Sequence, residues 1–411
     1  MAVPNCRFCN APLRLSLVDL GAMPLANSYL TAEQLAKPEP CYPLHARVCQ
    51  SCRLVQVDVA VPPREIFSDY AYFSSVAISW VEQARRFAAM ARTRWNLSRG
   101  SKVIEVASND GYLLRHFVEA EVPVLGVEPA ANVAAVAVAN GIPTEVAFFG
   151  RETAQRLRAA GHEADLIVGN NVLAHVPDIN DFVAGLALLL KPDGVVSLEF
   201  PHLLNLLAGM QFDTIYHEHF SYLSLLAVER ILAMHGLRVF DIEKLPTHGG
   251  SLRVLACRKE AQTFPEGAGL AKVRGDERMA RLDDDDAYRG FAPKVAATRD
   301  ALLAFLRRAR GEAKTVAAYG AAAKGNTLLN YCGVGADLVG YVVDRSPHKQ
   351  GRFLPGSHLP ILAPEAIYAR KPDYVLILPW NLQTEITAQL SGVRGWGGRF
   401  VIAIPSTVVL P

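Results

Sequence analysis

Four side chains that can exchange protons or hydrogen bonds stand next to one another in the segment Tyr216-His217-Glu218-His219. If the segment is extended, His217 and His219 share one side of the chain, and Tyr216 and Glu218 share the other. A histidine near its ordinary pKa is a competent base for a proton beside a ketone. A tyrosine or a second histidine can donate a hydrogen bond to the oxygen on which enolate charge develops. The pattern therefore favours an acid–base site.

Two other interpretations of the same residues stay open at this point. Two histidines and a carboxylate can be metal ligands, but the helical H-E-x-x-H spacing is absent here and nothing else completes a ligand set. The side chains could also be buried, hydrogen-bonded groups with no chemical role.

Two further residues are candidates for the same cleft. His175 comes shortly after a predicted strand over residues 165–169, so we expect it to face the same edge of the sheet. A lone histidine there more often has a structural role. The His-Glu-His segment at the same edge favours His175 as a second polar group at the reacting centre. Tyr72 precedes the first helix of the middle block, where a lid, a substrate wall and core packing are equal alternatives.

The cysteines predict a metal site at the start of the chain. Two C-x-x-C pairs are separated by an intervening segment, and such pairs can fold as two turns whose four thiolates surround Zn²⁺. Four thiolates leave no open position, so this zinc would be structural. Free thiols and a redox dithiol are the alternatives, the second disfavoured because no βαβ pattern precedes the motif. We expect the segment between the pairs to be loop-like. The predicted ligands are Cys6, Cys9, Cys49 and Cys52.

The middle block alternates predicted strands and helices, which indicates a parallel, doubly wound sheet. Residues 102–107 form a buried strand that ends in a turn of small and polar residues, where backbone N–H groups can meet a ligand. No G-x-G-x-x-G follows this strand, which weakens a dinucleotide interpretation. Glu128 ends the second strand, placed to accept hydrogen bonds from ribose hydroxyls. The candidate cofactor-binding residues are Ala107, Ser108, Asn109, Asp110, Gly111, Glu128, Pro129, Asn170 and Asn171.

The middle block ends in a predicted hairpin, with strands over 237–245 and 251–257. Five βα units followed by a final hairpin resemble the class I fold that binds S-adenosylmethionine. The loops after successive strands, including the segment around His219, would then gather at one edge of the sheet.

The last block repeats this logic on a smaller scale. A strand over 315–319 leads into a turn of small residues and then a helix, and Lys324 at the helix start suits a pyrophosphate. A bare packing turn is the alternative. Because the middle block already supplies a cofactor site, the second Rossmann-like unit suggests a substrate that carries a nucleotide. The candidate substrate-binding residues are Lys324, Asn326, Asp344 and His248.

Length and composition limit the remaining possibilities. The 411 residues predict two to three domains at about 150 residues each. Subtracting 40 acidic from 42 basic residues leaves +2, which disfavours a polyanion-binding surface. No apolar run reaches the about 18 residues that span a bilayer. The first residues lack an apolar signal core, and the seven cysteines cannot all pair, so we expect a cytoplasmic location.

These motifs occur in an order that resembles the sugar C-methyltransferases of deoxysugar pathways, such as the tetronitrose and mycarose 3-C-methyltransferases. The resemblance covers essentially the whole chain. Its motifs are the two C-x-x-C pairs, Ser108-Asn109-Asp110-Gly111, Asn170-Asn171-Val172-Leu173-Ala174-His175, Tyr216-His217-Glu218-His219-Phe220, Thr247-His248-Gly249-Gly250-Ser251 and Gly320-Ala321-Ala322-Ala323-Lys324-Gly325.

The resemblance implies an N-terminal zinc-binding domain over residues 1–65, a class I methyltransferase domain over 66–265 and a Rossmann-like domain over 266–411. It implies S-adenosylmethionine as methyl donor, with S-adenosylhomocysteine as product, and a nucleotide-linked 4-keto-6-deoxy sugar as substrate. In this family pattern His219 is the general base. The neighbours implied for it are Tyr216, Glu218, His175 and Tyr72.

We therefore predict that the protein methylates C3 of the sugar through an enolate generated by His219. Methylation at C5, or on an oxygen or nitrogen, stays open. A zinc-ribbon RNA methyltransferase is the rival class, disfavoured because the charge is balanced and no basic aromatic stretch is present. We expect no nucleic-acid or membrane partner. The chain shows no interface signature, so a monomer and a small homo-oligomer are both compatible with it.

Overall fold

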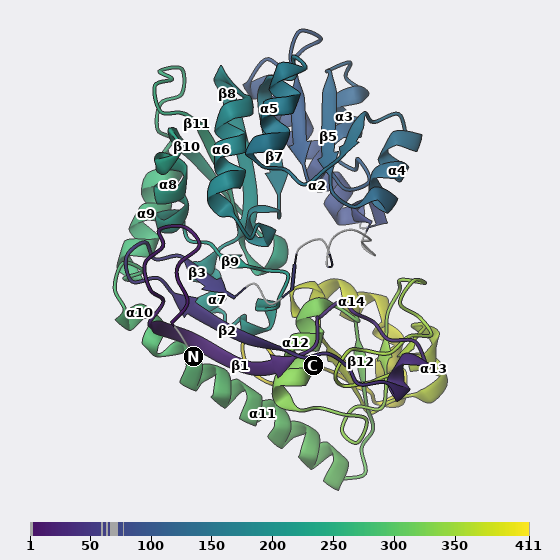
Figure 1. Ribbon diagram of the computed structural model, residues 1–411. Coiled ribbons are helices and arrows are strands. Elements are labelled where there is room, and N and C mark those ends of the chain that lie inside the picture. Colours follow the sequence, from purple (N-terminus) through teal and green to yellow (C-terminus); the bar gives the residue numbers. More distant parts are fainter. Residues whose placement is uncertain (1–2, 59–60, 63–64, 66–72, 77, 411) are drawn as a thin grey trace.

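The computed structural model describes residues 3–58, 61–62, 65, 73–76 and 78–410. Three sheets organise the chain (Figure 1). The largest has seven strands in the order β10-β11-β8-β7-β4-β5-β6. Its strands are β4 (Val103–Val106), β5 (Val124–Glu128), β6 (Thr144–Val146), β7 (Ala164–Asn170), β8 (Leu190–Pro201), β10 (Leu237–Leu245) and β11 (Ser251–Arg258).

This sheet is parallel apart from β11, which runs antiparallel to both β8 and β10. The chain passes from β4 to β5 on one side and returns to β7 on the other. Such a reversal opens a crevice at the carboxyl ends of the strands, where ligands of open α/β sheets bind. The predicted parallel sheet and final hairpin are therefore both present, with ends shifted by one to several residues.

Helices cover both faces of this sheet because successive strand residues point to opposite sides. Val103 packs with the helices of one face and Ile104 with those of the other. The first face carries α2 (Ile78–Arg94), α3 (Leu114–Val118) and α4 (Ala131–Ala139). The second carries α5 (Arg151–Ala159), α6 (Ile179–Leu189) and α8 (Leu225–Met234).

The segment between the two cysteine pairs contains two strands, so the loop-like expectation was wrong. These strands, β1 (Leu15–Met23) and β2 (Tyr42–Val48), form a four-stranded sheet with β3 (Val55–Val57), which follows the second pair, and with β9 (Ser221–Tyr222) from the middle block. In β2 every second residue is buried, with Leu44, Ala46 and Val48 facing the core. This period of two is the signal of a half-buried strand, which the prolines nearby obscured.

The C-terminal sheet has six strands in the order β14-β13-β12-β15-β16-β17, parallel except for β17. The strands are β12 (Val316–Tyr319), β13 (Val342–Val343), β14 (Ile361–Leu362), β15 (Tyr374–Ile377), β16 (Arg399–Ile402) and β17 (Val408–Val409). The helices are α12 (Ala323–Cys332), α13 (Glu365–Arg370) and α14 (Gln383–Gln389). Three helices precede them: α9 (Ala268–Met279), α10 (Asp286–Arg289) and α11 (Phe291–Gly311).

The described residues of the N-terminal block form no apolar core of their own. Its sheet residues share one apolar cluster with α11, α12 and the C-terminal sheet, and α11 runs beneath β1 in Figure 1. Its cysteines lie instead in the cluster that also holds α5, α6 and α8. The block thus joins the two larger units, and the boundaries near residues 65 and 265 stay predictions.

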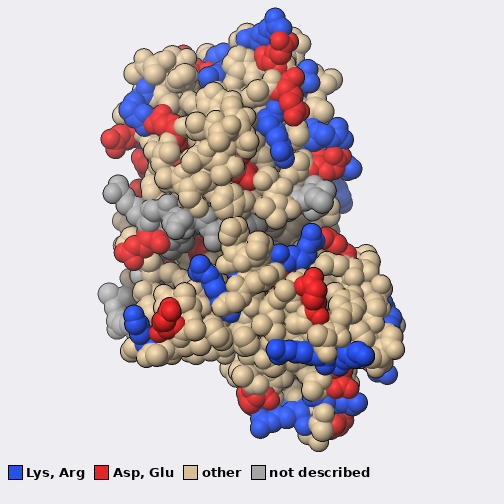
Figure 2. Space-filling model, turned by 90° about the vertical axis from the view of Figure 1, so that its right-hand side faces the viewer, with Lys and Arg blue, Asp and Glu red and all other residues tan. Residues whose placement is uncertain are grey.

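The surface carries no dominant charge on the face that Figure 2 shows, where basic and acidic side chains are interspersed. Among the described helices, none is both long and apolar enough to cross a bilayer.

Candidate active site

The Tyr216–His219 segment is a tight turn and not extended, so the arrangement that would follow from an extended chain does not occur. The His219 N–H donates to the Tyr216 carbonyl at 2.9 Å, which brings residues three apart together. The ring centres of Tyr216 and His219 lie 4.0 Å apart, and the Tyr216 hydroxyl lies 2.8 Å from Nε2 of His219. Tyr216 and His219 therefore share one side, and His217 points elsewhere.

The hydrogen bonds of His219 define its tautomer. Its Nδ1 lies 3.0 Å from the Thr214 carbonyl, which can only accept, so Nδ1 carries the proton. Nε2 then holds the lone pair and accepts from the Tyr216 hydroxyl. Burial, together with His175, lowers the pKa of His219 well below its ordinary value. His219 is therefore a neutral imidazole whose Nε2 can take a proton.

His175 meets His219 as predicted from its position after β7. The short helical turn η3 (Leu173–His175) places the two rings edge to face with centres 4.6 Å apart. Burial lowers the pKa of His175 to about 4, so this ring is neutral as well. A hydrogen bond to the backbone of Glu218 ties His175 to the same turn.

The other two members of the turn face the N-terminal block. His217 donates from Nε2 to the Tyr42 carbonyl at 3.1 Å. Glu218 is buried, and its two oxygens accept from the Asn27 amide at 2.8 and 2.9 Å. Burial raises the pKa of Glu218 to about 7. These two side chains anchor the turn, while Tyr216 contacts His219 and His219 contacts His175.

His248 and Lys324 approach the same centre from the hairpin and from the C-terminal unit. His248 lies in the left-handed region, φ +55°, with its ring edge-on to Trp80. Burial, Lys324 and His175 lower the pKa of His248 to about 4. The Lys324 ammonium lies 4.7 Å from the Trp380 ring centre and donates to Asn381 at 2.7 Å.

Asp344 and Asn326 play supporting parts in the structure. The Asp344 carboxylate follows β13 and accepts from the Ala321 N–H at 2.7 Å, so it shapes the turn before α12. Asn326 is buried, and its amide donates to the Ala26 carbonyl at 2.6 Å. The structure therefore brings Lys324 and His248 to the site and uses Asp344 and Asn326 to hold backbone. Tyr72 lies outside the described residues.

The predicted cofactor turn follows β4 at the crevice of the large sheet. Ala107, Asn109 and Gly111 all have positive φ, at 57°, 51° and 78°, which folds the turn back on itself. A Cβ on Gly111 would lie 2.9 Å from the Ile142 side chain, so only glycine fits there without a shift. Glu128 accepts from the Asn109 N–H at 2.9 Å.

The residues of this crevice fit a polar ligand. Three buried side-chain atoms, Ser108 Oγ, Asp110 Oδ1 and Asn170 Oδ1, have no hydrogen-bond partner within the described part of the chain. Buried polar atoms are normally paired, so these atoms mark a place where a ligand supplies the partners. Glu128 is 5% exposed and its second oxygen accepts from the Ala130 N–H at 2.9 Å. Pro129 and Asn171 lie beside these residues at the same edge.

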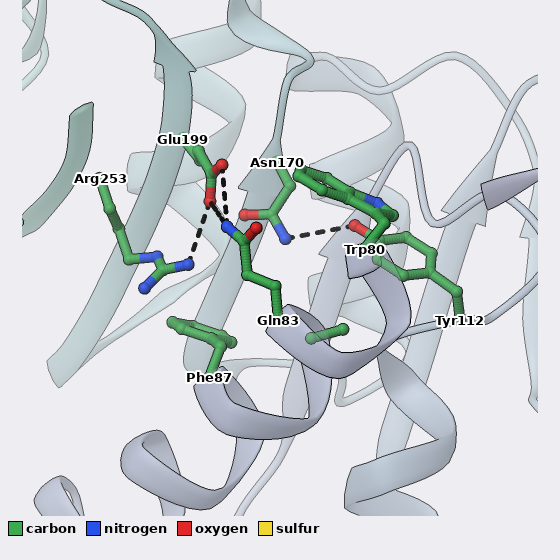
Figure 3. Close-up of a pocket in the computed structure, with 8 residues that line it drawn as sticks. Trp80, Gln83, Phe87, Tyr112, Asn170, Glu199 and Arg253 are labelled. Atoms are coloured by element: carbon green, nitrogen blue, oxygen red, sulfur yellow. Dashed lines mark hydrogen bonds and ion pairs between the residues drawn. The ribbon is translucent and has the colours of Figure 1, made fainter. Parts of the chain in front are cut away.

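Sequence reasoning missed a neighbouring pocket that Figure 3 shows between α2 and the ends of β7, β8 and β11. A buried ion pair joins Arg253 to Glu199 at 3.0 Å, and Gln83 also donates to Glu199. The sequence does carry a signal for this pocket, because Glu199 and Arg253 are opposite charges within two otherwise apolar strand segments. The lining residues are Trp80, Gln83, Ala84, Phe87, Tyr112, Asn170, Glu199 and Arg253.

The four predicted zinc ligands come together. Their sulfurs all lie within 4.8 Å of one another, with Cys6–Cys52 at 3.6 Å and Cys9–Cys49 at 3.4 Å. Tetrahedral zinc with bonds of about 2.3 Å needs sulfur separations of about 3.8 Å, so the set fits. Cys41 is exposed and lies outside the set.

Comparison with known proteins shows the family to which the chain belongs. The C-methyltransferase NovU of Streptomyces niveus is 36% identical over 408 residues, which cover 99% of this chain and 97% of that protein. The chain belongs to the C-methyltransferase family. The matching family models are "Putative zinc binding domain" over residues 6–67, "Methyltransferase domain" over 80–242 and "C-methyltransferase C-terminal domain" over 246–405.

Solved methyltransferase structures resemble part of this C-methyltransferase. Magnesium protoporphyrin IX methyltransferase (ChlM) from Synechocystis PCC 6803 superimposes with a TM-score of 0.35 at 16% identity, over 47% of this chain and 88% of that one. Family membership and the strand order confirm the predicted family, the class I fold, and S-adenosylmethionine and zinc as its cofactors.

We expect the Cys52→Ser variant to lose its zinc and to unfold at lower temperature, since structural zinc contributes folding free energy directly. Metal analysis of the purified protein and a thermal melt would measure both effects. Cys41→Ser is the matched control and should keep about one zinc per chain. A Cys52→Ser variant that retains full zinc would contradict the four-cysteine site.

We expect Glu128→Ala to weaken S-adenosylmethionine binding by roughly 10-fold or more, because hydrogen bonds to a charged group contribute about 1.5–3 kcal/mol. Isothermal titration calorimetry measures the dissociation constant. Glu145→Ala, on the neighbouring strand β6 but paired with Arg156 at the surface, is the control. Unchanged affinity in Glu128→Ala would remove this residue from the cofactor site.

Proposed function

We propose that this C-methyltransferase transfers a methyl group to C3 of a nucleotide-linked 4-keto-6-deoxy sugar, through an enolate formed by His219. The observation that carries the proposal is the tautomer of His219. Its protonated Nδ1 is bound to the Thr214 carbonyl, which leaves Nε2 as the proton acceptor. A carbon acid beside a ketone needs such a base, whereas methylation of an oxygen or nitrogen does not require an enolate.

His219 is the base of the proton-transfer step once the Tyr216 hydroxyl turns its hydrogen from Nε2 toward the substrate oxygen and so frees the lone pair. Nε2 takes the proton from the carbon beside the ketone, and the electron pair of that C–H bond moves into the enolate. Two neutral imidazoles, His175 and His248, and the Tyr216 hydroxyl supply hydrogen-bond donors near the developing oxygen charge. The new carbon–carbon bond would form from the enolate electron pair as the methyl–sulfur bond of the methyl donor breaks, with the electron pair of that bond going to sulfur to leave S-adenosylhomocysteine. The proton on His219 is then released to water.

S-adenosylmethionine supplies the electrophilic methyl group when it is bound. Residues Ser108 to Gly111 and Glu128 are proposed to hold it in the crevice after β4, and Asn170 with Asn171 to close the neighbouring side. Asn109 and Asp110 also accept from the Ser74 and Ser75 N–H groups, at 2.9 and 3.1 Å, so the turn is held before a ligand arrives. Holding both reactants in place supplies much of the rate.

The C-terminal unit is proposed to hold the nucleotide-linked part of the substrate. In its sheet β13 and β14 lie on one side of β12, and the later strands β15 and β16 lie on the other side. This change in strand order opens a second crevice. Lys324 and Trp380 lie at that crevice, beside His248. Lys324 is proposed to contact the substrate, while Asp344 and Asn326 keep the surrounding backbone in position.

Methyl-labelled S-adenosylmethionine, offered with thymidine-, guanosine- and cytidine-linked 4-keto-6-deoxy sugars, tests the substrate class by mass spectrometry. NMR of the product then locates the methyl group. C5 also flanks the ketone, so a methyl at C5 would keep the base and correct the position. Transfer to RNA but to none of these sugars would overturn the proposal. A cytoplasmic location and a monomer or small homo-oligomer stay predictions.

We expect His219→Asn to bind S-adenosylmethionine normally yet to lose methyl transfer by at least 100-fold. It should also fail to exchange the substrate α-proton with solvent deuterium, because asparagine cannot accept that proton. NMR in deuterium oxide follows the exchange. His162→Asn is the matched control, since His162 lies between α5 and β7, outside the turn that carries His219, and should leave exchange within threefold. Exchange that persists in His219→Asn would overturn the base assignment.

We expect the exchange rate to stay constant as pH falls to 6.5 and to decline only at lower pH. The base must be deprotonated, and its pKa lies well below the ordinary histidine value of about 6.5. Protonation therefore removes activity only when pH falls past that lowered pKa. Measuring exchange between pH 5 and 8 checks this. Glu218 in the same turn has a pKa of about 7, so the profile is also measured in Glu218→Gln. An acidic limb centred above pH 6.5 that persists in this variant would contradict the buried, neutral His219.

A further inference from the structure

The first zinc-binding turn carries an arginine between its two cysteines. The Arg7 N–H donates to Oε1 of Gln56 at 2.9 Å, and Nε2 of the same Gln56 donates to the Cys6 sulfur at 3.1 Å. Gln56 is 2% exposed and belongs to β3. One amide side chain therefore ties the backbone of Arg7 to a metal-binding sulfur.

The guanidinium of Arg7 contacts both the loop that carries His175 and the loop that carries His219. Nη1 donates at 3.2 Å to the Pro177 carbonyl, two residues after His175. The Arg7 carbon Cζ lies 5.6 Å from the ring centre of Phe220, the residue after His219, which is within the range of a cation–π contact.

A second route joins Arg7 to the His219 loop through the backbone. Nη2 donates to the Val57 carbonyl, and the Val57 N–H donates to the Phe220 carbonyl at 3.1 Å. Beyond this bond β3 pairs with β9, with Gln56 opposite Ser221. The strand that follows His219 is thus built directly on the strand that contacts the zinc site.

We propose that Arg7 is a positioning residue that holds the loops of His175 and His219 together, so that zinc binding is a condition for proton abstraction. The fork of an arginine can donate to two carbonyls and lie on a ring at once, which a lysine cannot do. Because the histidine rings touch at 4.6 Å, a shift of either loop displaces the base. The proposal rests on the proposed role of His219.

The test compares Arg7→Met with Arg53→Met. Both arginines are half-buried on the zinc turns, but Arg53 follows the second cysteine pair and binds Asp285 at 2.6 Å, away from the histidines. For each variant, zinc content, S-adenosylmethionine affinity, α-proton exchange, kcat and KM are measured with the sugar that the wild-type enzyme methylates. A displacement of about 1 Å in a reacting group can cost about 100-fold in rate.

Arg7→Met should keep one zinc and bind S-adenosylmethionine within twofold, while exchange and kcat fall roughly 10- to 100-fold and KM changes little. Arg7→Lys should recover only part of the loss, and Arg53→Met should retain kcat within threefold. Unchanged kcat in Arg7→Met, a change in KM alone, or loss of zinc in Arg7→Met would overturn the positioning role.

Removing zinc tests the coupling between the metal site and proton exchange independently of Arg7. A chelator that strips the metal from the wild-type enzyme should lower α-proton exchange in proportion to the zinc lost, and added zinc should restore it. Full exchange without zinc would overturn the coupling even if Arg7→Met were impaired. Persistent exchange in His219→Asn would instead refute the proposed base, so the two failures can be told apart.

Discussion

The active site depends on how residues 212–222 are held while nearly all of their polar groups are buried. The bond from His219 Nδ1 to the Thr214 carbonyl closes this segment on itself and orients the His219 ring. Donors from distant parts of the chain bind three more groups of this segment. Those donors are Asn27 to Glu218, Val57 to the Phe220 carbonyl and Thr327 to the Ile215 carbonyl. An unsatisfied buried group costs about 1–3 kcal/mol, so each donor constrains the position of the segment that carries His219.

Burial also sets the electrostatics of the site. An ionised imidazole is costly in a dry environment, so His175, His219 and His248 are all held neutral. Burial lowers the pKa of Lys324 but raises that of Asp213 to about 6. The Trp380 indole joins these two groups, because it donates to Asp213 at 2.7 Å and its ring faces the Lys324 ammonium. The site thus combines one ionisable pair, Lys324 and Asp213, with three neutral histidines.

Local patterns predicted the parts of the structure that depend on neighbouring residues. The strands of the large sheet, the turn after β4 and the four cysteines follow from apolar runs, small residues and fixed spacing. The turn at His219 did not, because its shape depends on Asn27 and Tyr42, almost 200 residues away in the sequence. Trp380 and Asp213 were missed for the same reason, since neither residue has a distinctive neighbour in sequence.

The packing of the N-terminal block gives its zinc site a structural role. Its apolar residues are divided between two cores, with Leu44 packed toward the C-terminal unit and Phe8 toward the methyltransferase unit. A block of about 60 residues divided in this way cannot fold on apolar burial alone, so zinc must supply the missing free energy. The block nevertheless places Asn27 against Glu218 and Arg7 beside Phe220. Under the proposal made for Arg7, a metal that stabilises these contacts acts on the proposed base, His219, through packing and without touching the substrate.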